Sequence, residues 1–213
     1  MKRDRLCVVG NGPSAIQKHN GDFINSCDHV IRMGNCDTSN YTEFVGDKTT
    51  IYAGRWKKLE NNIQMCRTCD EIWLLYPEPP HDWNSNYIGE ESITRNSISI
   101  ERIGVNDENI KYVPEQLCDH YRDIYTNTRL PKKSDKSCGF NIPATGTVAI
   151  DMAVLMYPEH DVYITGFDGY FLNTSYYFDT NRTLGKDFTN DNDTLTQFVE
   201  LKKTIIRHNI HVI

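Results

Sequence analysis

The feature that most constrains the fold is a series of short apolar segments, each closed by glycine, asparagine or proline. They are too short for typical helices and are rich in β-branched and aromatic residues, as buried strands are. The segments occupy residues 6–9, 29–33, 49–53, 71–76 and 161–165, with further candidates at 111–113 and 210–213. Helical or loop segments separate them. The sequence therefore predicts an α/β fold with a mostly parallel central sheet flanked by helices.

Helices are predicted between and after these strands. Residues 145–156 (TGTVAIDMAVLM) are small or apolar at most positions, so this helix should be buried, and Pro158 should end it. Residues 115–125 and 194–208 should form two more helices, and residues 15–20 should begin a short first helix.

Composition limits the class of partner. The 213 residues suit one domain, with a flap predicted within residues 82–136, and the chain reads as a possible fragment of a longer protein. A net charge of −6 does not suit binding to the negatively charged backbone of a nucleic acid. We therefore expect a small molecule as the partner. No run of about 18 apolar residues and no signal-peptide core is present, which predicts no transmembrane segment and a cytoplasmic location.

The loop at residues 10–14 (GNGPS) is the first candidate site. It follows a predicted strand, where a parallel sheet exposes backbone N–H groups at its carboxyl edge and binds nucleotides. It lacks the third glycine of the dinucleotide fingerprint and the G-K-[ST] of a P-loop, which disfavours NAD and Walker-type binding. An ordinary tight turn is the alternative interpretation.

Further segments favour the nucleotide interpretation. Residues 28–35 and 45–50 are predicted where successive strands leave the same sheet edge. The helix at 145–156 should point its free N–H groups and positive dipole end at a nucleotide phosphate or a sugar carboxylate. Tyr170, Tyr176 and Tyr177 could donate hydrogen bonds to a leaving phosphate, with aromatic packing as the alternative.

Together these segments resemble known sialyltransferases. Residues 8–11 (VVGN), 28–33, 45–50 (VGDKTT), 143–146 (PATG) and 166–167 resemble the large and small sialylmotifs of eukaryotic glycosyltransferase family 29. Residues 10–14, 163–168 (YITGFD), 175–180 and 188–192 (FTNDN) are similar to the bacterial lipooligosaccharide sialyltransferases of family 42. The resemblance implies a Rossmann-like GT-A variant that transfers a sugar from a CMP-sugar to a glycan hydroxyl, with inversion and without a metal.

The resemblance also implies roles for particular residues. It places the donor along the glycine loop, the end of the second strand and the start of the buried helix, and it gives two tyrosines to the departing phosphate. The implied donor-binding residues are Asn11, Gly12, Ser14, Gly34, Asn35, Thr145, Gly146 and Asp168, and the implied phosphate-holding residues are Tyr170 and Tyr176.

The chain departs from the family patterns at the general base. The bacterial pattern has a histidine after F-x-N-D-N, whereas here residues 188–192 run directly into the last helix. Asp191 or Asp193 could replace that histidine as a base, and Asp193 could instead be the N-cap of the helix. Ile142 and Ala144 replace the arginine and serine of the bacterial motif, which leaves the donor sugar open between sialic acid and another sugar.

Two alternatives follow from these departures. Residues 191–193 have the D-x-D form with which other GT-A enzymes hold a divalent ion, so a UDP-sugar transferase dependent on Mn or Mg is one. A catalytically silent nucleotide-sugar-binding domain is the other. Cys66 and Cys69 form a single C-x-x-C without a second pair, and this pattern does not predict a zinc site.

Overall fold

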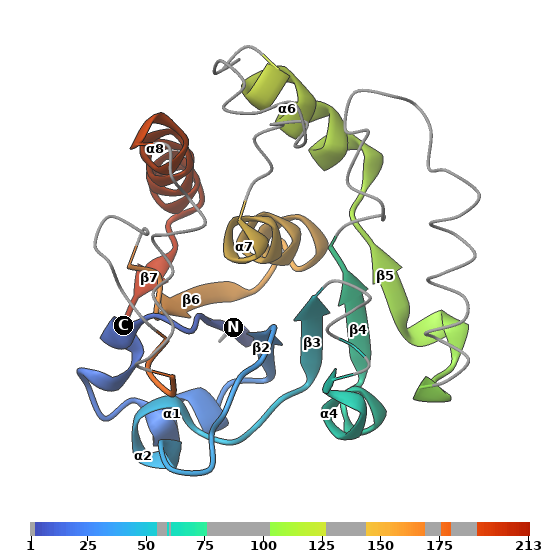
Figure 1. Ribbon diagram of the computed structural model, residues 1–213, viewed down its shortest axis with the longest axis vertical. Helices are drawn as coiled ribbons and strands as arrows, with labels where there is room; N and C mark the ends of the chain where they lie inside the picture. The colour runs from blue at the N-terminus through green and yellow to red at the C-terminus, as the bar shows by residue number, and fades with distance from the viewer. Residues whose placement is uncertain are drawn as a thin grey trace.

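The protein is built on a seven-stranded parallel sheet with helices on both faces (Figure 1). The computed structural model describes residues 3–54, 59, 61–75, 103–126, 144–168, 176–179 and 191–213. The strands are β1 (Arg5–Val9), β2 (His29–Met33), β3 (Ile51–Gly54), β4 (Glu71–Leu74), β5 (Ile110–Tyr112), β6 (Asp161–Thr165) and β7 (His211–Val212). The helices are η1 (Pro13–Ile16), α1 (Gly21–Asn25), α2 (Thr42–Val45), α4 (Ile63–Thr68), η3 (Asp107–Asn109), α6 (Glu115–Thr126), α7 (Thr145–Met156) and α8 (Asp191–His208).

The order of the strands creates a switch point between β1 and β6. The sheet order is β5-β4-β3-β2-β1-β6-β7, and every pairing is parallel. The chain first builds the sheet outward from β1 to β5, and then returns to add β6 and β7 on the other side of β1. Ligands of open α/β sheets bind beyond the carboxyl ends of the strands at such a reversal. The topology thus directs attention to the loops after β1 and β6.

The short strand β7 forms one edge of the sheet. Val212 on this strand and Ile206 at the end of α8 are exposed.

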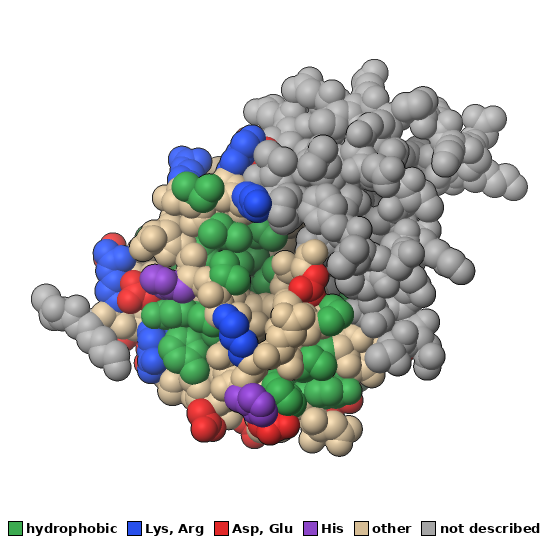
Figure 2. Space-filling model, turned by 90° about the vertical axis from the view of Figure 1, so that its left-hand side faces the viewer, with side chains coloured by type: hydrophobic (Ala, Val, Ile, Leu, Met, Phe, Trp, Pro, Cys, Tyr) green, Lys and Arg blue, Asp and Glu red, His purple; other side chains and the backbone are tan. Residues whose placement is uncertain are grey.

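On the side of the molecule drawn in Figure 2, basic and acidic side chains are interspersed among apolar ones, with no continuous basic stripe among the described residues. Within the described ranges, no helix has the length and apolarity needed to cross a bilayer.

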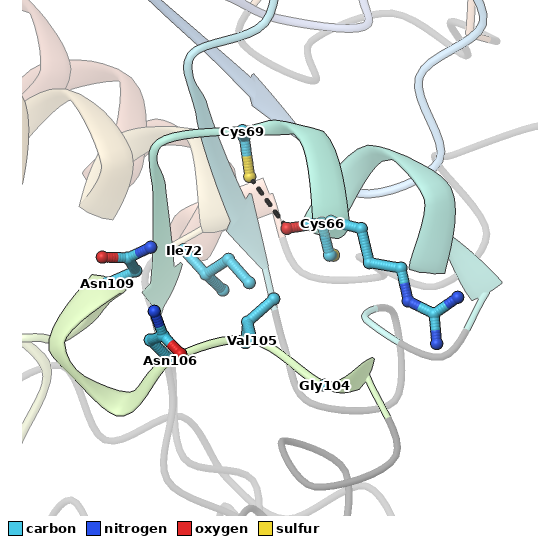
Figure 3. A pocket seen from close by; sticks show the side chains of 8 residues that line it. Cys66, Cys69, Ile72, Gly104, Val105, Asn106 and Asn109 are labelled. Carbon is cyan, nitrogen blue, oxygen red and sulfur yellow. Dashed lines mark hydrogen bonds between the residues drawn. The ribbon is translucent and has the colours of Figure 1, made fainter.

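One face of the sheet is covered by α1, α2 and α4. Alternate residues of β1 and β2 pack against α1 and α2, whereas Tyr52, Ile72 and Leu74 pack beside α4. A cavity of about 180 Å³ lies between α4 and the segment that leads into β5 (Figure 3). Cys66 and Cys69 line it. Both residues come before β4 in the chain, so the cavity lies at the amino edge of the sheet, opposite the edge at which ligands of this fold class bind.

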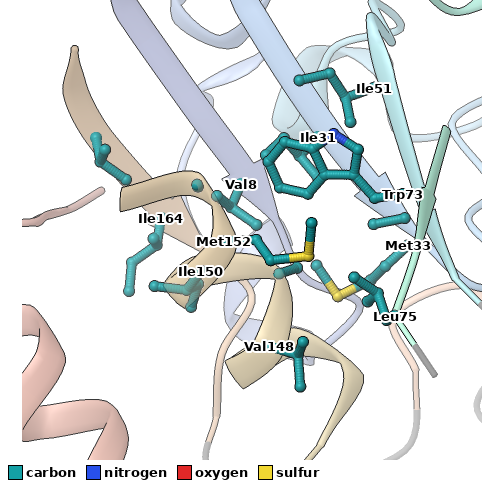
Figure 4. Close-up of a cluster of buried hydrophobic side chains, with 14 of the residues drawn as sticks. Val8, Ile31, Met33, Ile51, Trp73, Leu75, Val148, Ile150, Met152 and Ile164 are labelled. Carbon is teal, nitrogen blue, oxygen red and sulfur yellow. The ribbon is translucent and has the colours of Figure 1, made fainter. Parts of the chain in front are cut away.

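The other face carries α6, α7 and α8, and holds the largest core cluster. Side chains of β1, β2, β3, β4 and β6 that point to this face surround α7 (Figure 4). Val148, Ile150 and Met152 of α7 are fully buried, as the apolar composition of this helix predicted. The fold class predicted from the sequence is confirmed.

Most predicted elements form where expected, and the first helix is the exception. Helix 145–156 and the strands at 29–33 and 161–165 have the predicted bounds. The helix predicted to begin at residues 15–20 is wrong, because the chain makes one 3-10 turn at Pro13–Ile16 and then a short helix at Gly21–Asn25. Proline favours the first turn of a helix, and Ala15 turns inward to be buried. The predicted flap lies largely outside the described residues.

Candidate functional site

The loop after β1 does not expose its backbone N–H groups as the sequence suggested. Three of its four available N–H groups already have acceptors within the protein. The hydrogen bonds run from Gly10 N to Thr165 O at 2.7 Å, from Gly12 N to Gly166 O at 2.9 Å and from Ser14 N to Asp168 Oδ2 at 3.2 Å. The expectation that these three N–H groups are exposed is wrong, because Thr165 at the end of β6 and the residues after it supply their acceptors. Nucleotide binding by this loop stays a prediction.

Close approach of the two segments explains the glycines. A Cβ at Gly10 would lie 2.3 Å from the carbonyl oxygen of Gly166, and a Cβ at Gly12 would lie 1.8 Å from Asp168 Oδ2. Gly166 itself has a φ of +76°, in the left-handed region that favours glycine. Asp168, predicted to bind the donor, therefore stabilises the loop by accepting a hydrogen bond from Ser14 N beside Gly12.

Asn11 in this loop has a side-chain acceptor that can recognise a ligand. Its Nδ2 donates to Met33 O at 3.0 Å, which ties the loop to the carboxyl end of β2. Its Oδ1 is buried and has no hydrogen-bond partner among the described residues. A buried acceptor without a partner is costly, so a hydroxyl or amino group of a ligand would stabilise it. Gly34 lies alongside, since a Cβ built there would be 3.9 Å from Asn11 Nδ2.

The start of α7 is brought to the same place. A Cβ at Gly146 would lie 2.6 Å from the ring of Phe167 and 3.5 Å from Met33 Sδ, so the first turn of α7 meets the ends of β6 and β2. The residue before the helix, Ala144, makes no side-chain cap. Thr145, Gly146 and Thr147 come before the first intrahelical hydrogen bond, and their N–H groups have no partner within the helix. The helix dipole adds positive potential, so this end suits an anion.

The tyrosine segment at residues 176–179 covers the loop after β1. Tyr177 N donates to Asn11 O at 3.1 Å, and the Tyr177 hydroxyl donates to Asp37 O at 2.9 Å. Tyr177 is buried, and burial raises the pKa of its hydroxyl. The alternative of aromatic packing is therefore correct for Tyr177, which stacks edge-on against Tyr41. Tyr176 is half-buried next to it, and stacks on Phe178.

The segment 45–50 lies at the opposite edge of the sheet from the site. It leads into β3, so it sits at the amino ends of the strands, where Thr50 N donates to Val30 O at 3.0 Å. The fully buried Arg32 reaches it, with Nη2 donating to Val45 O at 2.6 Å and Nε to Lys48 O at 3.0 Å. The prediction that this segment shares the ligand edge is wrong, because a chain returning from a crossover enters its strand at the amino end.

For the remaining predicted site residues, the structure gives the exposure of Asn35 and the helix positions of Asp191 and Asp193, but no side-chain contacts. Asn35 is exposed directly after Gly34. Tyr170 lies outside the described residues. Helix α8 begins at Asp191, so Asp193 lies inside the first turn and the N-cap interpretation for it is wrong. Acidic residues suit this turn because of the dipole. In a parallel crossover the helix starts from the carboxyl edge, which puts this turn on the ligand side of the sheet.

Metal-binding side chains do not converge in the part of the chain that the structure describes. No group of three or more histidine, cysteine, aspartate or glutamate residues is arranged to hold an ion there. The side chains of Asp191 and Asp193 are outside the part of the chain in which this arrangement was sought. Cys66 and Cys69 are free thiols, and burial raises their pKa values to about 12 and about 11.

The family follows from the sequence. Residues 2–200 match the sequence model of glycosyltransferase family 29 (sialyltransferase). The chain belongs to glycosyltransferase family 29. A curated relative, the CMP-N-acetylneuraminate-beta-galactosamide-alpha-2,3-sialyltransferase 1 of Gallus gallus, is 28% identical over 173 residues. The matched segment is 77% of this chain and 44% of the relative, so the chain spans less than half of that relative's length.

Solved structures agree in fold with this family 29 chain. A crystal structure of a mammalian sialyltransferase in complex with Gal-beta-1-3GalNAc-ortho-nitrophenol has a TM-score of 0.61 at 16% identity. A second structure of a mammalian sialyltransferase has a TM-score of 0.59 at 15% identity. Each comparison covers 99% of this chain and 69% of the solved chain. At this identity the likeness concerns the fold.

Two contributors to the site were not found from the sequence. Phe167 closes the gap between β6 and α7, and Tyr52 reaches the end of β2 through its hydroxyl. A tyrosine in the middle of a central strand was the available signal for Tyr52, because a buried hydroxyl needs a hydrogen-bond partner. Phe167 belongs to the segment 166–167 that carries the family resemblance, but the motif gave no indication that its ring meets the start of α7.

Proposed function

We propose that this chain carries the catalytic region of a sialyltransferase, which moves sialic acid from CMP-sialic acid to a hydroxyl of a galactoside. The observation that carries the proposal is the family 29 match over residues 2–200. The name of the curated relative supports both substrates, since it specifies CMP-N-acetylneuraminate and a beta-galactosamide. The meeting of the β1 loop, the end of β2 and the start of α7 supports an anionic nucleotide as the donor.

The donor would lie across the carboxyl ends of β1, β2 and β6. In this arrangement the N–H groups at Thr145 and Gly146 bind an anionic group of CMP-sialic acid, helped by the dipole of α7. The orphan Oδ1 of Asn11 accepts a hydrogen bond from a hydroxyl or amino group of the nucleoside. Gly34 and Asn35 would lie next to the donor. Gly12 and Ser14 hold the β1 loop to the segment after β6 through their bonds to Gly166 and Asp168.

The chemistry would be a single displacement. The acceptor oxygen bonds to the anomeric carbon while the bond from that carbon to the phosphate oxygen breaks, and CMP leaves with the electron pair. Asp191 or Asp193 takes the proton of the acceptor hydroxyl, in the role of the missing histidine. Tyr170 and Tyr176 donate hydrogen bonds to the departing phosphate, where negative charge develops.

A transfer assay tests the proposal. The 213-residue chain is incubated with CMP-sialic acid and an aryl glycoside of Gal-β1,3-GalNAc, with EDTA or with manganese, and the product is measured by mass spectrometry. CMP and UDP are compared in a thermal-shift assay, since a ligand of the native state must raise the melting temperature. Asp191→Asn and Asp193→Asn are assayed in parallel, and loss of kcat with unchanged CMP binding would identify the base.

The outcomes separate the candidate functions. Transfer of sialic acid in EDTA supports the proposal. Transfer from a UDP-sugar only with manganese would replace it with a metal-dependent enzyme that uses residues 191–193. Tight CMP binding without transfer or donor hydrolysis would overturn it in favour of a silent binding domain.

A further inference from the structure

A fully buried tyrosine lies beside the proposed donor site without belonging to any residue set assigned to it. Tyr52 is the second residue of β3 and has no exposed surface. Its strand neighbours Ile51 and Ala53 pack against α7 on one face, and Tyr52 points to the opposite face beside α4. Gly54 leaves room for the ring, since a Cβ there would lie 3.2 Å from the Tyr52 hydroxyl oxygen.

The hydroxyl of Tyr52 connects two segments of the chain. It accepts a hydrogen bond from Asn62 Nδ2 at 3.1 Å and donates one to Gly34 O at 3.0 Å. Burial raises the pKa of this hydroxyl, so it keeps its proton and remains a donor. The direction of the two bonds is therefore fixed: Asn62 supports Tyr52, and Tyr52 holds Gly34.

Gly34 is the residue at which β2 leaves the sheet, and it needs such support. Its φ is +62°, and a glycine has access to both signs of φ. Strand β3 holds it at both backbone groups, because Gly34 N also donates to Ala53 O at 3.3 Å. Fixing Gly34 in turn fixes the backbone next to Asn11, whose Nδ2 lies 3.9 Å from a Cβ built at Gly34.

We propose that Tyr52 is a positioning residue for the nucleotide donor, holding the Gly34–Asn35 turn against Asn11 before the donor arrives. This inference rests on the proposed function. Tyr52 is covered by protein and acts through Gly34. Removing its hydroxyl therefore changes none of the side chains that contact the donor, and it releases only the turn that Tyr52 holds. The free turn then samples more conformations, and CMP must order it on binding. One lost hydrogen bond predicts roughly 3- to 10-fold weaker CMP binding.

The test compares Tyr52→Phe with Tyr157→Phe. The Tyr157 ring follows the end of α7 and lies 4.8 Å, centroid to centroid, from the ring of His29, the first residue of β2, so this control loses the same atom at the amino edge of the sheet, away from the donor side. CMP affinity is measured by calorimetry, and hydrogen exchange of the peptide spanning residues 33–35 is measured without ligand. Asn62→Ala, which removes the hydrogen bond from Asn62 Nδ2 to the Tyr52 hydroxyl, serves as a second variant if Tyr52→Phe folds poorly.

The inference expects Tyr52→Phe to weaken CMP binding and speed exchange at residues 33–35, with Asn62→Ala intermediate and Tyr157→Phe unchanged in both. Unaltered CMP affinity in a folded Tyr52→Phe protein would overturn it, as would equal weakening by Tyr157→Phe. If the wild-type protein does not bind CMP, the proposed function fails and the donor-positioning role of Tyr52 fails with it. The exchange rate then reports separately whether Tyr52 holds the turn.

Discussion

The loop after β1 and the start of α7 look alike in sequence but differ in what their N–H groups can do. Both are glycine-containing segments at the carboxyl edge of the sheet, and both were predicted to expose N–H groups where the nucleotide binds. In the β1 loop, Gly10 donates to the last residue of β6, and Gly12 and Ser14 donate to the segment after it. At the start of α7, Thr145 and Gly146 have no intrahelical acceptor and the cap is an alanine.

The difference teaches that a glycine loop after a strand can serve structure while a neighbouring helix end keeps its N–H groups available to a ligand. In the β1 loop the glycines permit backbone contact between segments far apart in the sequence. In α7, Gly146 permits close contact with Phe167 and Met33, so the start of the helix lies at the carboxyl ends of β6 and β2. We therefore expect substitutions in the loop to affect mainly stability, and substitutions at the start of α7 to affect mainly CMP binding.

The largest effect is expected from Gly10→Ala. The added Cβ would lie 2.3 Å from Gly166 O, and backbone on both sides leaves little freedom to move. We expect a loss of about 3 kcal/mol in the free energy of unfolding. In a chain of this size that corresponds to a fall of roughly 6–12 °C in Tm, measured by thermal unfolding.

Gly104→Ala is the matched control for that prediction. Gly104 has a φ of +70° but no atom within 4 Å of its added Cβ, so only backbone strain opposes the alanine. We expect this variant to lose about 1 kcal/mol. Equal melting temperatures for the two variants would contradict the claim that contact with Gly166 requires glycine at position 10.

An intermediate effect is expected from Thr145→Pro, which tests the α7 end directly. Proline is well tolerated at the first helical position, and Ala144 has the extended backbone (φ −60°, ψ 145°) that a residue before proline prefers. The variant removes one open N–H group and should keep the helix. We expect roughly 10-fold weaker CMP binding with Tm within a few degrees of wild type.

Thr145→Ala separates the N–H group from the side chain. It removes the hydroxyl and keeps the N–H, so CMP affinity should lie closer to wild type than that of Thr145→Pro. If alanine and proline weaken binding equally, the hydroxyl of Thr145 is the ligand-binding group. If neither weakens it, the start of α7 is not an anion site and the contrast with the β1 loop is lost.

The smallest effect is expected from Asp151→Asn, which asks how α7 is held in place. The carboxylate of Asp151 accepts hydrogen bonds from Tyr121 at 2.6 Å and from Thr204 at 3.0 Å, joining α7 to α6 and α8. Burial raises the pKa of Asp151, against the hydrogen bonds and the nearby His120 and His208, which lower it. A raised native pKa means that the folded protein favours the protonated carboxyl.

The pH dependence follows from that sign. The stability contributed by protonated Asp151 is fully present below its unfolded pKa and is lost as pH rises through its native pKa. Asparagine does not titrate, so the variant should become more stable relative to wild type as pH rises from the acid side to neutrality. We expect a change below about 1 kcal/mol, measured by urea unfolding at several pH values. A constant difference between the two proteins would contradict the prediction.

The site was predictable where a residue acts through its own position on a strand or helix. Asn11, Gly34 and Gly146 were predicted because each follows a strand or begins a helix, and the structure brings their segments together. Their binding of a donor stays a prediction. The prediction failed for residues 45–50 and for Tyr177. Their roles depend on which edge they reach and which distant backbone group they meet, and the local pattern carries no information on either.

The sequence by itself determined the strands, the buried helix and the family. Each of these depends on local chemistry: apolar periodicity, chain-breaking residues and the spacing of short motifs. The tertiary structure alone decided which N–H groups remain open to a ligand. Ser14 and Asp168 are 154 residues apart, and only the placement of β6 beside β1 brings the carboxylate to that N–H group. A hydrogen bond forms wherever a donor first meets an acceptor in three dimensions, so its availability for binding is a property of the fold.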